Sequence, residues 1–420
     1  MKKIISKKNP IIPGLGVCDP HIHIFNNKMY LYASHDSRPD TRGFCMNDWH
    51  IWSSADAIEW TLDCVVRPED FFMGASDCCW AVDVACRNGK YYYYFSDGSK
   101  KIGVAVSDRP DGPFKDALGR PLLDGTVTTT REYDPTVFED DDGEYYLVFG
   151  GPAWCYGEGG GYFIVRLNED MVSFAETPKK LELDHCGDDK ASLNKFGGKY
   201  YLSYGGFYAI SDSVYGPYRF IGHTASTIDH SSFFEWNGQI FQAITVKEQE
   251  FYRASGLCYV HIKENGELVT DPLIIENGVG QYDSDWNRIE AEWYMKGENV
   301  KKVENKNLCG FCVSCTEHAT LTYPKIRNLS DKVGISLDYY CVGGKAAIDI
   351  MAGGVNGRLL GTICIERPTD SFEWYCRRNS FFRFDAPLND VEDLCLVLKP
   401  ENGATLWVSE FHFFTEASQL

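Results

Sequence analysis

Five titratable residues occupy the same position in a sequence motif that occurs five times along the chain. Each stands ten to twelve positions ahead of an apolar or aromatic residue, across a turn that contains Asn or Gly. The pairs are Asp19/Tyr30, Asp83/Tyr93, Asp134/Tyr146, Asp189/Tyr201 and His230/Phe241. Four of the five are carboxylates, and like-charge repulsion between clustered carboxylates keeps one protonated near neutral pH while another stays ionised. If these residues converge, they predict general acid–base chemistry.

The copy at residues 133–151 shows which element positions such a residue. It has an Asp134-Pro135 head, an apolar run at 136–138, an acidic Asp-Gly turn and a returning aromatic run at 145–149. Two strand-like runs around a Gly-containing turn predict a β-hairpin. Proline restricts its own φ and the residue before it, so the acid has a stiff backbone. For a single copy we favour an ordinary loop acid next to a turn, but five copies in register favour a shared site.

The repeat predicts the fold of the first two thirds of the chain. Turns fall near residues 27, 89, 143, 198 and 238, and β-rich units at such a period are typical of propeller blades. The spacing is irregular, so we expect insertions. The Trp- and Asp-rich stretch 34–77 is interpreted as an insertion of long loops that wall a substrate site, within which 49–54 alternates like a strand. Residues 1–18 lead into the first repeat and are expected to close the ring with the last blade.

The last copy of the repeated hairpin motif ends before a polar, Gly-containing stretch at 277–287. Beyond it, short strand-like runs continue between turn signals, which is typical of a β-sandwich. Helical periodicity is nearly absent throughout. We therefore predict an all-β protein, with a five-bladed β-propeller at 1–282 and a β-sandwich (jelly-roll) domain at 283–420.

Charge and cysteine content exclude several classes of protein. The 420 residues carry a formal net charge of -19, which argues against binding nucleic acid or an anionic membrane. The basic start has no apolar signal core, and sixteen scattered cysteines fit reduced thiols, so a cytoplasmic location is expected. Cys309, Cys312 and Cys315, followed by His318, have metal-like spacing, but residues three apart on a strand point to opposite faces. We interpret them as buried thiols.

The repeated motifs and the segments between them resemble those of glycoside hydrolase family 43, the five-bladed propeller glycosidases. The resemblance covers roughly residues 10–282 and is carried by Asp19-Pro20, 80–84, 103–107, 134–138, 167–171, 198–204 and 230–235. The tail, from 289–292 through Trp374 to 411–414, more weakly resembles a family 6 carbohydrate-binding module. The run 406–411 lacks the ligand asparagine often found near the last strand of such modules. A structural or degenerate module is therefore an equal alternative to a sugar-binding one.

The resemblance implies roles for three acids. Asp19 matches the general base and Asp134 the residue that tunes and orients the acid. Where the family usually has a glutamate as general acid, this chain has Asp189, one methylene shorter, with Asp188 as second choice and Glu158 as a further alternative. Lys190 beside the acid would lower its pKa unless the side chain points away.

The remaining expected site residues also follow from the resemblance. His230 matches an axial histidine, often near a central water or metal ion, although a hydrogen-bonded structural histidine is the alternative. Candidate substrate-binding residues are Trp80, Asp83, Trp154, Phe207, His230 and Arg253. Glu290 and Glu292 are candidate ligands for a structural Ca²⁺, since calcium prefers oxygen ligands. No cofactor is expected for the chemistry itself.

The resemblance implies an inverting, exo-acting glycosidase whose partner is an oligosaccharide derived from plant polysaccharides. The first expectation is an α-L-arabinofuranosidase and/or β-xylosidase. Alternatives are a β-galactofuranosidase, a galactosidase, or a carbohydrate-binding protein that has lost catalysis. A protein-interaction scaffold is disfavoured by the acids in register. The sugar, the linkage and the oligomeric state stay open.

Overall fold

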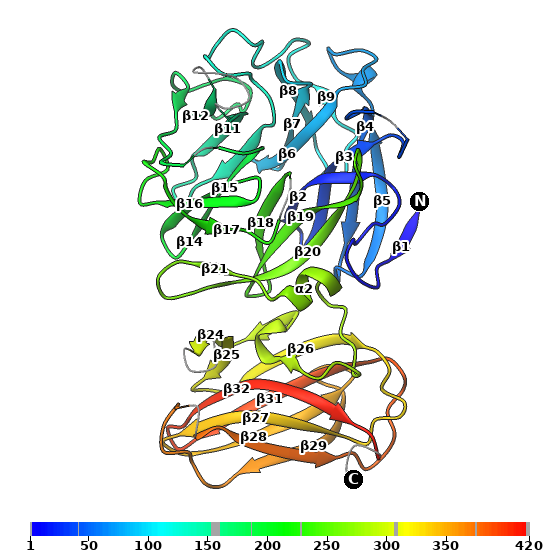
Figure 1. Cartoon of the computed structure of the whole chain (residues 1–420), viewed down its shortest axis with the longest axis vertical. Coiled ribbons are helices and arrows are strands. Elements are labelled where there is room, and N and C mark those ends of the chain that lie inside the picture. Colours follow the sequence, from blue (N-terminus) through cyan, green and yellow to red (C-terminus); the bar gives the residue numbers. More distant parts are fainter. Residues whose placement is uncertain are drawn as a thin grey trace. The chain divides into compact units, whose positions relative to one another are not determined.

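The computed structural model describes residues 2–40, 42–152, 160–185, 187–226, 229–305, 310–373 and 376–416. These residues are built almost wholly of β-strands (Figure 1) and form two compact units. The first unit comprises Met1–Phe234, Phe241–Val260 and Glu267–Gly278, and the second Glu235–Ile240, His261–Gly266 and Val279–Leu420. The described residues contain one short α-helix, α2 (Pro272–Asn277), and no helix long and apolar enough to cross a membrane.

Five antiparallel sheets follow one another in chain order and are arranged around a common centre (Figure 1), which confirms the predicted five-bladed propeller. Blade 1 holds β1 (Lys3–Ile5), β2 (Val17–Phe25), β3 (Lys28–Asp36), β4 (Met46–Ser54) and β5 (Glu59–Val66), and blade 2 holds β6 (Cys79–Arg87), β7 (Lys90–Asp97), β8 (Lys101–Ser107) and β9 (Lys115–Asp116). Blade 3 holds β10 (Thr136–Glu139), β11 (Tyr145–Gly151), β12 (Gly161–Arg166) and β13 (Lys179–Lys180). Blade 4 holds β14 (Ala191–Phe196), β15 (Lys199–Tyr204), β16 (Phe207–Ser211) and β17 (Arg219–His223), and blade 5 holds β18 (Ser231–Trp236), β19 (Gln239–Gln249), β20 (Tyr252–Ile262) and β21 (Leu268–Val269).

The predicted hairpins are the first two long strands of each blade. Four of their turns have two consecutive residues at positive φ: Asn26-Asn27 (52° and 59°), Asn88-Gly89 (53° and 74°), Gly197-Gly198 (56° and 78°) and Asn237-Gly238 (52° and 76°). Asn and Gly tolerate this region better than other residues, and two-residue turns of this kind match the twist of paired strands. The turn chemistry read from the sequence therefore sets the register of these hairpins.

The interpretation of 34–77 as long loops is wrong for most of the stretch, whereas the strand-like alternation at 49–54 is confirmed by β4. The end of β3 and the whole of β4 and β5 lie there and complete blade 1. Their tryptophans Trp49, Trp52 and Trp60 are fully buried. The Asp56 carboxylate accepts hydrogen bonds from the backbone N–H groups of Ile58 and Glu59 at the β4–β5 turn. The tryptophans fill the blade core because strands here are covered by apolar side chains on both sides.

The beginning of the chain joins the first blade to the last. Strand β1 pairs with β5, and the backbone N–H of Ile11 then bonds to the Ser255 carbonyl on β20. The Asn9 side chain donates to the Leu257 carbonyl at 2.8 Å and accepts from the Leu257 N–H at 2.9 Å. The predicted closure of the ring by residues 1–18 is confirmed, through these hydrogen bonds.

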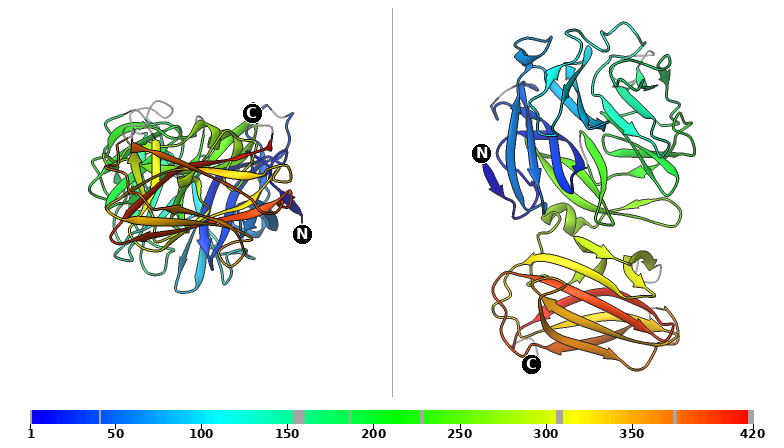
Figure 2. Two further views of the ribbon diagram at one scale, coloured as in Figure 1. Left: turned by 90° about the horizontal axis from the view of Figure 1, so that it is seen from below. Right: turned by 180° about the vertical axis from the view of Figure 1, so that it is seen from behind.

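The second unit contains two antiparallel sheets (Figure 2), which fits the predicted β-sandwich. One holds β22 (Ile289–Glu290), β24 (Lys301–Asn305), β25 (Gly310–Cys315), β32 (Thr405–Phe414), β27 (Gly334–Val342) and β30 (Arg378–Arg383). The other holds β23 (Lys296–Glu298), β26 (Ala319–Ile326), β31 (Glu392–Glu401), β28 (Lys345–Ala352) and β29 (Arg358–Ile365). Cys312 and Cys315 are buried, free thiols on β25, while Cys309 and Trp374 lie outside the described residues.

Candidate active site

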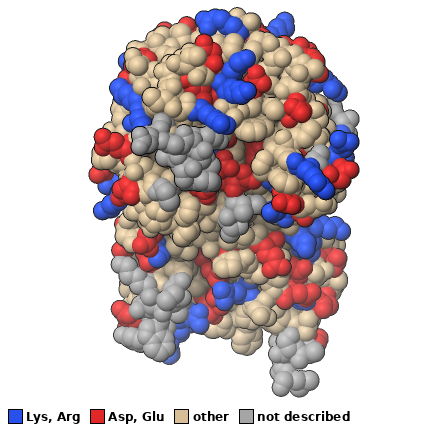
Figure 3. All heavy atoms as spheres, turned by 45° about the horizontal axis from the view of Figure 1, so that its top comes forward, with Lys and Arg blue, Asp and Glu red and all other residues tan. Residues whose placement is uncertain are grey.

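The heads of the innermost strands surround one cavity of about 160 Å³ in the first unit. It is lined by Asp19, Phe44, Met46, Trp80, Ala81, Tyr133, Asp134, Asp189, Asp229, His230 and Arg253. Figure 3 shows acidic atoms gathered in a hollow on the surface. Four of the five repeated titratable residues therefore line the same cavity, contributed by blades 1, 3, 4 and 5. Blade 2 contributes Trp80 to the lining instead of its repeated residue, Asp83.

Three of the lining aspartates have a left-handed backbone. The φ angles of Asp19, Asp134 and Asp229 are 52°, 51° and 54°. Non-glycine residues avoid this region, and strained residues of this kind cluster at functional sites. The Ser96 hydroxyl supports one of them by accepting a hydrogen bond from the Asp134 N–H at 2.7 Å. The strain turns each carboxylate out of the regular alternation of its strand and toward the cavity.

His230 stands between the carboxylates. Its Nε2 lies 3.2 Å from Asp189 Oδ1 and 3.4 Å from Asp134 Oδ2, and its Nδ1 lies 3.9 Å from Asp19 Oδ1. Burial alone would lower the pKa of the imidazole, but Asp19, Asp189 and Asp134 together raise it to about 10. The ring is therefore charged at neutral pH and offsets part of the surrounding negative charge.

Arg253 holds a second group of acids. Its Nη1 donates to Asp19 Oδ1 at 2.7 Å and to Asp229 Oδ2 at 2.8 Å, and its Nη2 donates to Asp36 Oδ1 at 3.0 Å. The Asp36 carboxylate also accepts from the Arg253 backbone N–H at 2.8 Å. Arg253 and Asp36 are buried. This network fixes the position of Asp19 from behind the cavity.

The environment separates the carboxylates into ionised and protonated groups. For Asp19, burial is outweighed by the charges of Arg253 and His230, so its pKa is lowered. For Asp134, burial and repulsion by Asp189 prevail over the attraction of His230 and raise the pKa to about 7. The pKa of Asp229 is likewise raised to about 7 by burial and by repulsion from Asp19 and Asp189, against the pull of Arg253.

Asp189 differs from both. Its side chain is 35% exposed, more than those of Asp19, Asp134 and His230 around it. Burial acts to raise its pKa, but the charge of His230 and hydrogen bonds from His230 and Asp229 lower it overall. Two carboxyl groups form a hydrogen bond only when one keeps its proton. With its raised pKa, Asp229 is the donor and Asp189 the acceptor.

The neighbours of Asp189 point elsewhere. Asp188 does not line the cavity, and its carboxylate lies against the Gly205 backbone, where a Cβ would approach Oδ2 to 2.4 Å. The Lys190 ammonium donates to the Val82 carbonyl of blade 2 at 3.0 Å. Lys190 acts on Asp189 through its backbone N–H, which bonds to Oδ1 at 2.9 Å. The lysine side chain thus points away from the acid.

Aromatic and apolar side chains form the rest of the wall. The rings of Trp80 and Tyr133 meet edge to face, 6.1 Å between centroids. Phe44 is 43% exposed, and the Arg253 guanidinium lies 4.5 Å from its ring centroid. Together with Met46 these rings make an amphipathic pocket, with carboxylates on one side and aromatic faces on the other, as sugar sites require.

Two of the predicted site residues, Asp83 and Phe207, have other positions. Asp83 is fully buried and outside the cavity lining, bonded to His23 and to the Val137 N–H. Phe207 packs against His185 and His223 within blade 4, with ring centroids 4.9 and 5.0 Å apart. Trp154 and Glu158 lie outside the described residues.

Sequence reasoning missed Asp36, Phe44, Met46, Tyr133 and Asp229. A signal existed for Asp229, because it lies two residues before β18, just as Asp134 lies two residues before β10. Nothing local marks Asp36, which acts through Arg253, 217 residues away.

Comparisons with known proteins agree with this geometry. The model of the glycosyl hydrolases family 43 matches residues 7–204. The xylosidase/arabinosidase 43A of Humicola insolens is 31% identical over 294 residues, covering 55% of this chain and 88% of its relative. The chain belongs to glycosyl hydrolase family 43. Membership in family 43 makes it a glycoside hydrolase.

Two solved family 43 structures extend the comparison. A β-xylosidase/α-arabinofuranosidase from a compost metagenome, in complex with xylotriose and in a calcium-free form, has a TM-score of 0.55 and 28% identity, covering 64% of this chain and 98% of its own. An arabinoxylan arabinofuranohydrolase from Bacillus subtilis, in complex with cellotetraose, has a TM-score of 0.56 and 19% identity, with 97% of both chains covered. The second similarity shows the fold alone. The resemblance of 283–420 to family 6 modules stays a prediction.

Two places fit the cation expectations. Around His230, Asp134 with Asp189 and Asp19 with Asp229 each bring their ligand atoms and a ring nitrogen within 4.8 Å of one another. In the second unit, the carboxyl of Glu292 is buried and hydrogen-bonded to that of Glu290, and both influences raise its pKa. Glu292 Oε2 has no hydrogen-bond partner within the described part of the chain. Either a shared proton or a bound cation relieves such a pair.

Proposed function

We propose that this family 43 chain is an inverting exo-glycosidase that removes single α-L-arabinofuranosyl and/or β-D-xylosyl units from oligosaccharides derived from plant polysaccharides. The observation that carries the proposal is the meeting of Asp19, Asp134 and Asp189 around His230 at one cavity. A cavity of about 160 Å³ suits one sugar ring better than a long segment of polymer. The named relatives act on such sugars.

Asp19 is proposed as the general base. Its lowered pKa keeps it ionised, and Arg253 holds the carboxylate through two nitrogens, at 2.7 and 3.3 Å. A fixed, ionised carboxylate orients a water molecule for attack on the anomeric carbon. Asp134 carries no substrate proton in this scheme. Its carboxyl lies 3.4 Å from His230, and its charge influences the protonation of the general acid, Asp189.

Asp189 is proposed as the group that protonates the leaving oxygen. Inversion needs about 6.5–9.5 Å between base and acid, so that water fits beside the sugar. Ligand atoms of Asp19 and Asp229 lie within 4.8 Å of each other, too close for that arrangement. Asp189 contacts the opposite nitrogen of His230 from Asp19 and is the more exposed. The hydrogen bond with Asp229 supplies the proton that Asp189, ionised on its own, lacks.

The apolar side of the cavity is proposed to bind the sugar ring. Trp80 and Tyr133 offer a corner of aromatic surface. The Asp36–Arg253 network lies behind the carboxylates and acts on the sugar only through Asp19 and Asp229.

The experiment is hydrolysis of nitrophenyl α-L-arabinofuranoside, β-D-xyloside, β-D-galactofuranoside and β-D-galactoside. We expect turnover of one or both of the first two, and ¹H NMR of the released sugar should show the inverted anomer first. Asp19→Asn and Asp189→Asn should each reduce kcat by at least ~10³-fold, and Asp40→Asn, in an exposed loop, should not. Retention of configuration would reject the base role of Asp19. Unchanged turnover in Asp189→Asn would move the acid elsewhere.

A sugar-binding protein without catalysis is the second candidate, and it is favoured by one observation, the aspartate at position 189. Calorimetry with arabino- and xylo-oligosaccharides would then show binding without product. Asp189→Glu adds one methylene and discriminates between the candidates. Activity that appears only in this variant would identify a decayed enzyme.

We also propose a structural Ca²⁺ held by Glu290 and Glu292. The mutual hydrogen bond of the two carboxyls and the unpartnered Oε2 support it. Calcium should raise the melting temperature of the wild type above that in EGTA, and Glu292→Gln should abolish the difference. An equal effect of calcium on both proteins would place the ion elsewhere.

A further inference from the structure

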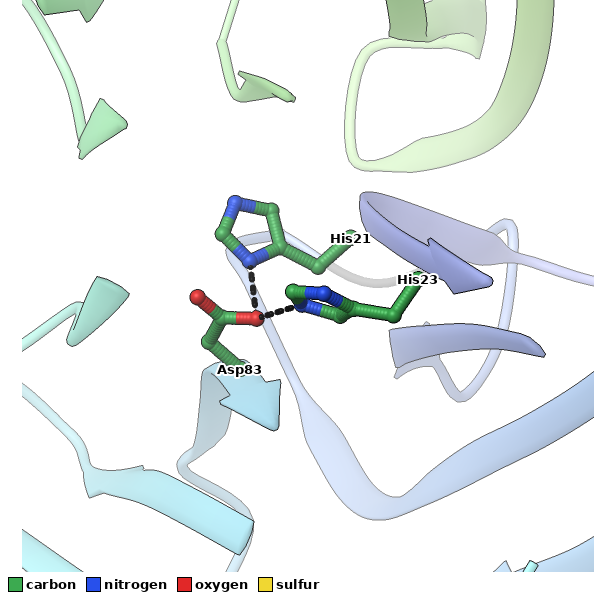
Figure 4. A group of neighbouring side chains, drawn as sticks. All are labelled: His21, His23 and Asp83. Carbon is green, nitrogen blue, oxygen red and sulfur yellow. Dashed lines mark hydrogen bonds and ion pairs between the residues drawn. The ribbon is translucent and has the colours of Figure 1, made fainter. Parts of the chain in front are cut away.

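A second group of titratable side chains lies between blades 1 and 2, outside the cavity. It consists of His21 and His23 on β2 and Asp83 on β6 (Figure 4). Residues two apart on a strand share a face, so both imidazoles turn toward the neighbouring blade. His21 Nδ1 and His23 Nε2 each lie 2.6 Å from the same oxygen, Asp83 Oδ1. None of the three lines the catalytic cavity.

A single carboxylate oxygen receives both imidazoles. The contact of His23 Nε2 with Asp83 Oδ1 has hydrogen-bond geometry. His21, which is 3% exposed, forms an ion pair with the same oxygen through Nδ1. Its Nε2 has no hydrogen-bond partner within the described part of the chain. Two imidazole nitrogens and one carboxylate oxygen, all potential metal ligands, therefore meet at one place.

We infer that His21, His23 and Asp83 form a binding site for a divalent transition metal of the Zn²⁺ type. Two imidazole nitrogens and one carboxylate oxygen are a ligand set that zinc favours and calcium does not. Zinc binds such ligands at about 2.0–2.2 Å, so each nitrogen–oxygen distance, now 2.6 Å, needs to lengthen by less than about 1 Å to admit the ion. The His23 side chain is 30% exposed, which leaves room for water as fourth ligand.

The surroundings hold the carboxylate in place. The backbone N–H of Val84 donates to Asp83 Oδ1, and that of Val137 donates to Oδ2, both at 2.7 Å. Such outer hydrogen bonds orient a ligand. The neighbouring ammonium of Lys190 donates to the Val82 carbonyl. It interacts with the charge of Asp83 itself and, more weakly, with those of Asp134, Asp19 and Asp189. An ion at this point joins the innermost strands of two blades. It also binds next to the catalytic strand head in sequence, because His21 is two residues from Asp19.

The test is metal binding by the full chain after removal of metals with EDTA. We expect the wild type to bind about one equivalent of Zn²⁺ and to show a raised melting temperature. Co²⁺ in its place should give the intense visible bands of a tetrahedral N,O site. His23→Gln, at the partly exposed position, should lose the bands and bind Zn²⁺ at least ~100-fold more weakly.

His35→Gln is the matched control, because His35, Asp48 and His50 form another His–Asp–His group in blade 1. It should keep the metal. Absence of a stoichiometric ion in the wild type, or the same affinity and bands in His23→Gln, would overturn the inference. X-ray absorption of zinc in the wild type gives a readout that does not depend on the folding of any variant. It should show two imidazole ligands. None of these readouts depends on the glycosidase activity, so the two proposals fail separately.

Discussion

At the scale of residues, one guanidinium contacts three carboxylates. Arg253 is 3% exposed and bonds to Asp19, Asp36 and Asp229. Together with that of His230, its charge outweighs the burial of Asp19 and lowers the pKa of that carboxylate, so Asp19 stays ionised. Removing one partner of a buried ion pair leaves an uncompensated charge, which is far more costly than losing an exposed pair.

Arg253→Met should therefore lower the free energy of unfolding by about 3–5 kcal/mol and kcat/KM by at least ~10²-fold. Arg109→Met is the control, because Arg109 is 67% exposed and pairs with Asp111 at the surface. It should change stability by less than ~1 kcal/mol. Urea unfolding and steady-state kinetics measure both effects. Equal losses in the two variants would show that Arg253 does not hold a buried network.

Asp134 makes stability depend on pH in a defined direction. Its pKa is about 7 in the folded protein, above the 3.8 of an ordinary aspartate, so the folded state keeps a proton that the unfolded chain loses. The contribution of Asp134 is present in full below about pH 4 and is lost as the pH rises through about 7. Asp134→Asn stays neutral, so it should gain stability relative to the wild type between pH 4 and 7. Urea unfolding across this range, with Asp40→Asn as the exposed control, should show a rising difference only for Asp134→Asn.

At the scale of elements, close packing of aromatic rings in blade 2 requires a glycine. A Cβ on Gly103 in β8 would lie 2.2 Å from Phe95 Cζ and 2.7 Å from Phe72 Cε1. The rings of Phe72 and Phe95 are stacked with centroids 5.8 Å apart. The strand therefore has no room for any side chain at this position without displacing a buried ring.

Gly103→Ala should lower the free energy of unfolding by about 1–3 kcal/mol through overpacking. Gly222→Ala, in β17, adds the same methyl group at 3.6 Å from its nearest neighbour, Tyr208 Cε1. It should be close to neutral. Urea unfolding compares the two, and a neutral Gly103→Ala would mean that the phenylalanines move aside freely.

The sequence predicted the strands better than it predicted the contacts between distant residues. The register of a hairpin is set by the residues of its own turn, such as Asn88-Gly89. All five hairpins could therefore be found from the sequence. The stretch 34–77 was misread because its density of Trp and Asp was taken as the mark of an insertion, whereas Trp49 and Trp52 fill a blade. Asp19 and Asp134 could be found from a repeat. Asp36 could not, because its role is set by an arginine 217 residues away.

At the scale of the whole molecule, the ring is closed by side-chain hydrogen bonds. All four strands of blade 5 come from 231–269, so no strand of blade 1 is exchanged. The Asn9 amide bonds to both backbone groups of Leu257 and also donates to the Ile275 carbonyl at 2.9 Å. One buried side chain thus secures the junction between the two ends of the propeller.

Asn9→Ala should lower the free energy of unfolding by about 1–3 kcal/mol, because buried backbone groups of Leu257 lose their partners. Hydrogen exchange should increase first at Leu257 and its neighbours on β20. Asn47→Ala removes an exposed amide that bonds at 3.4 Å to the Ser76 carbonyl and should leave both measurements unchanged. Uniform exchange across all blades in Asn9→Ala would argue against a local opening.

The pairing of Asp19 with Arg253 has a consequence during translation. The two residues are 234 positions apart, which at roughly 5–20 residues per second separates their synthesis by on the order of tens of seconds. During that time the nascent chain holds the aspartate without its counter-charge, whatever blades have already formed. Ribosome-bound chains that end before residue 253 should therefore be inactive, however many blades they contain. The enzyme acquires its activity only in the last part of propeller synthesis.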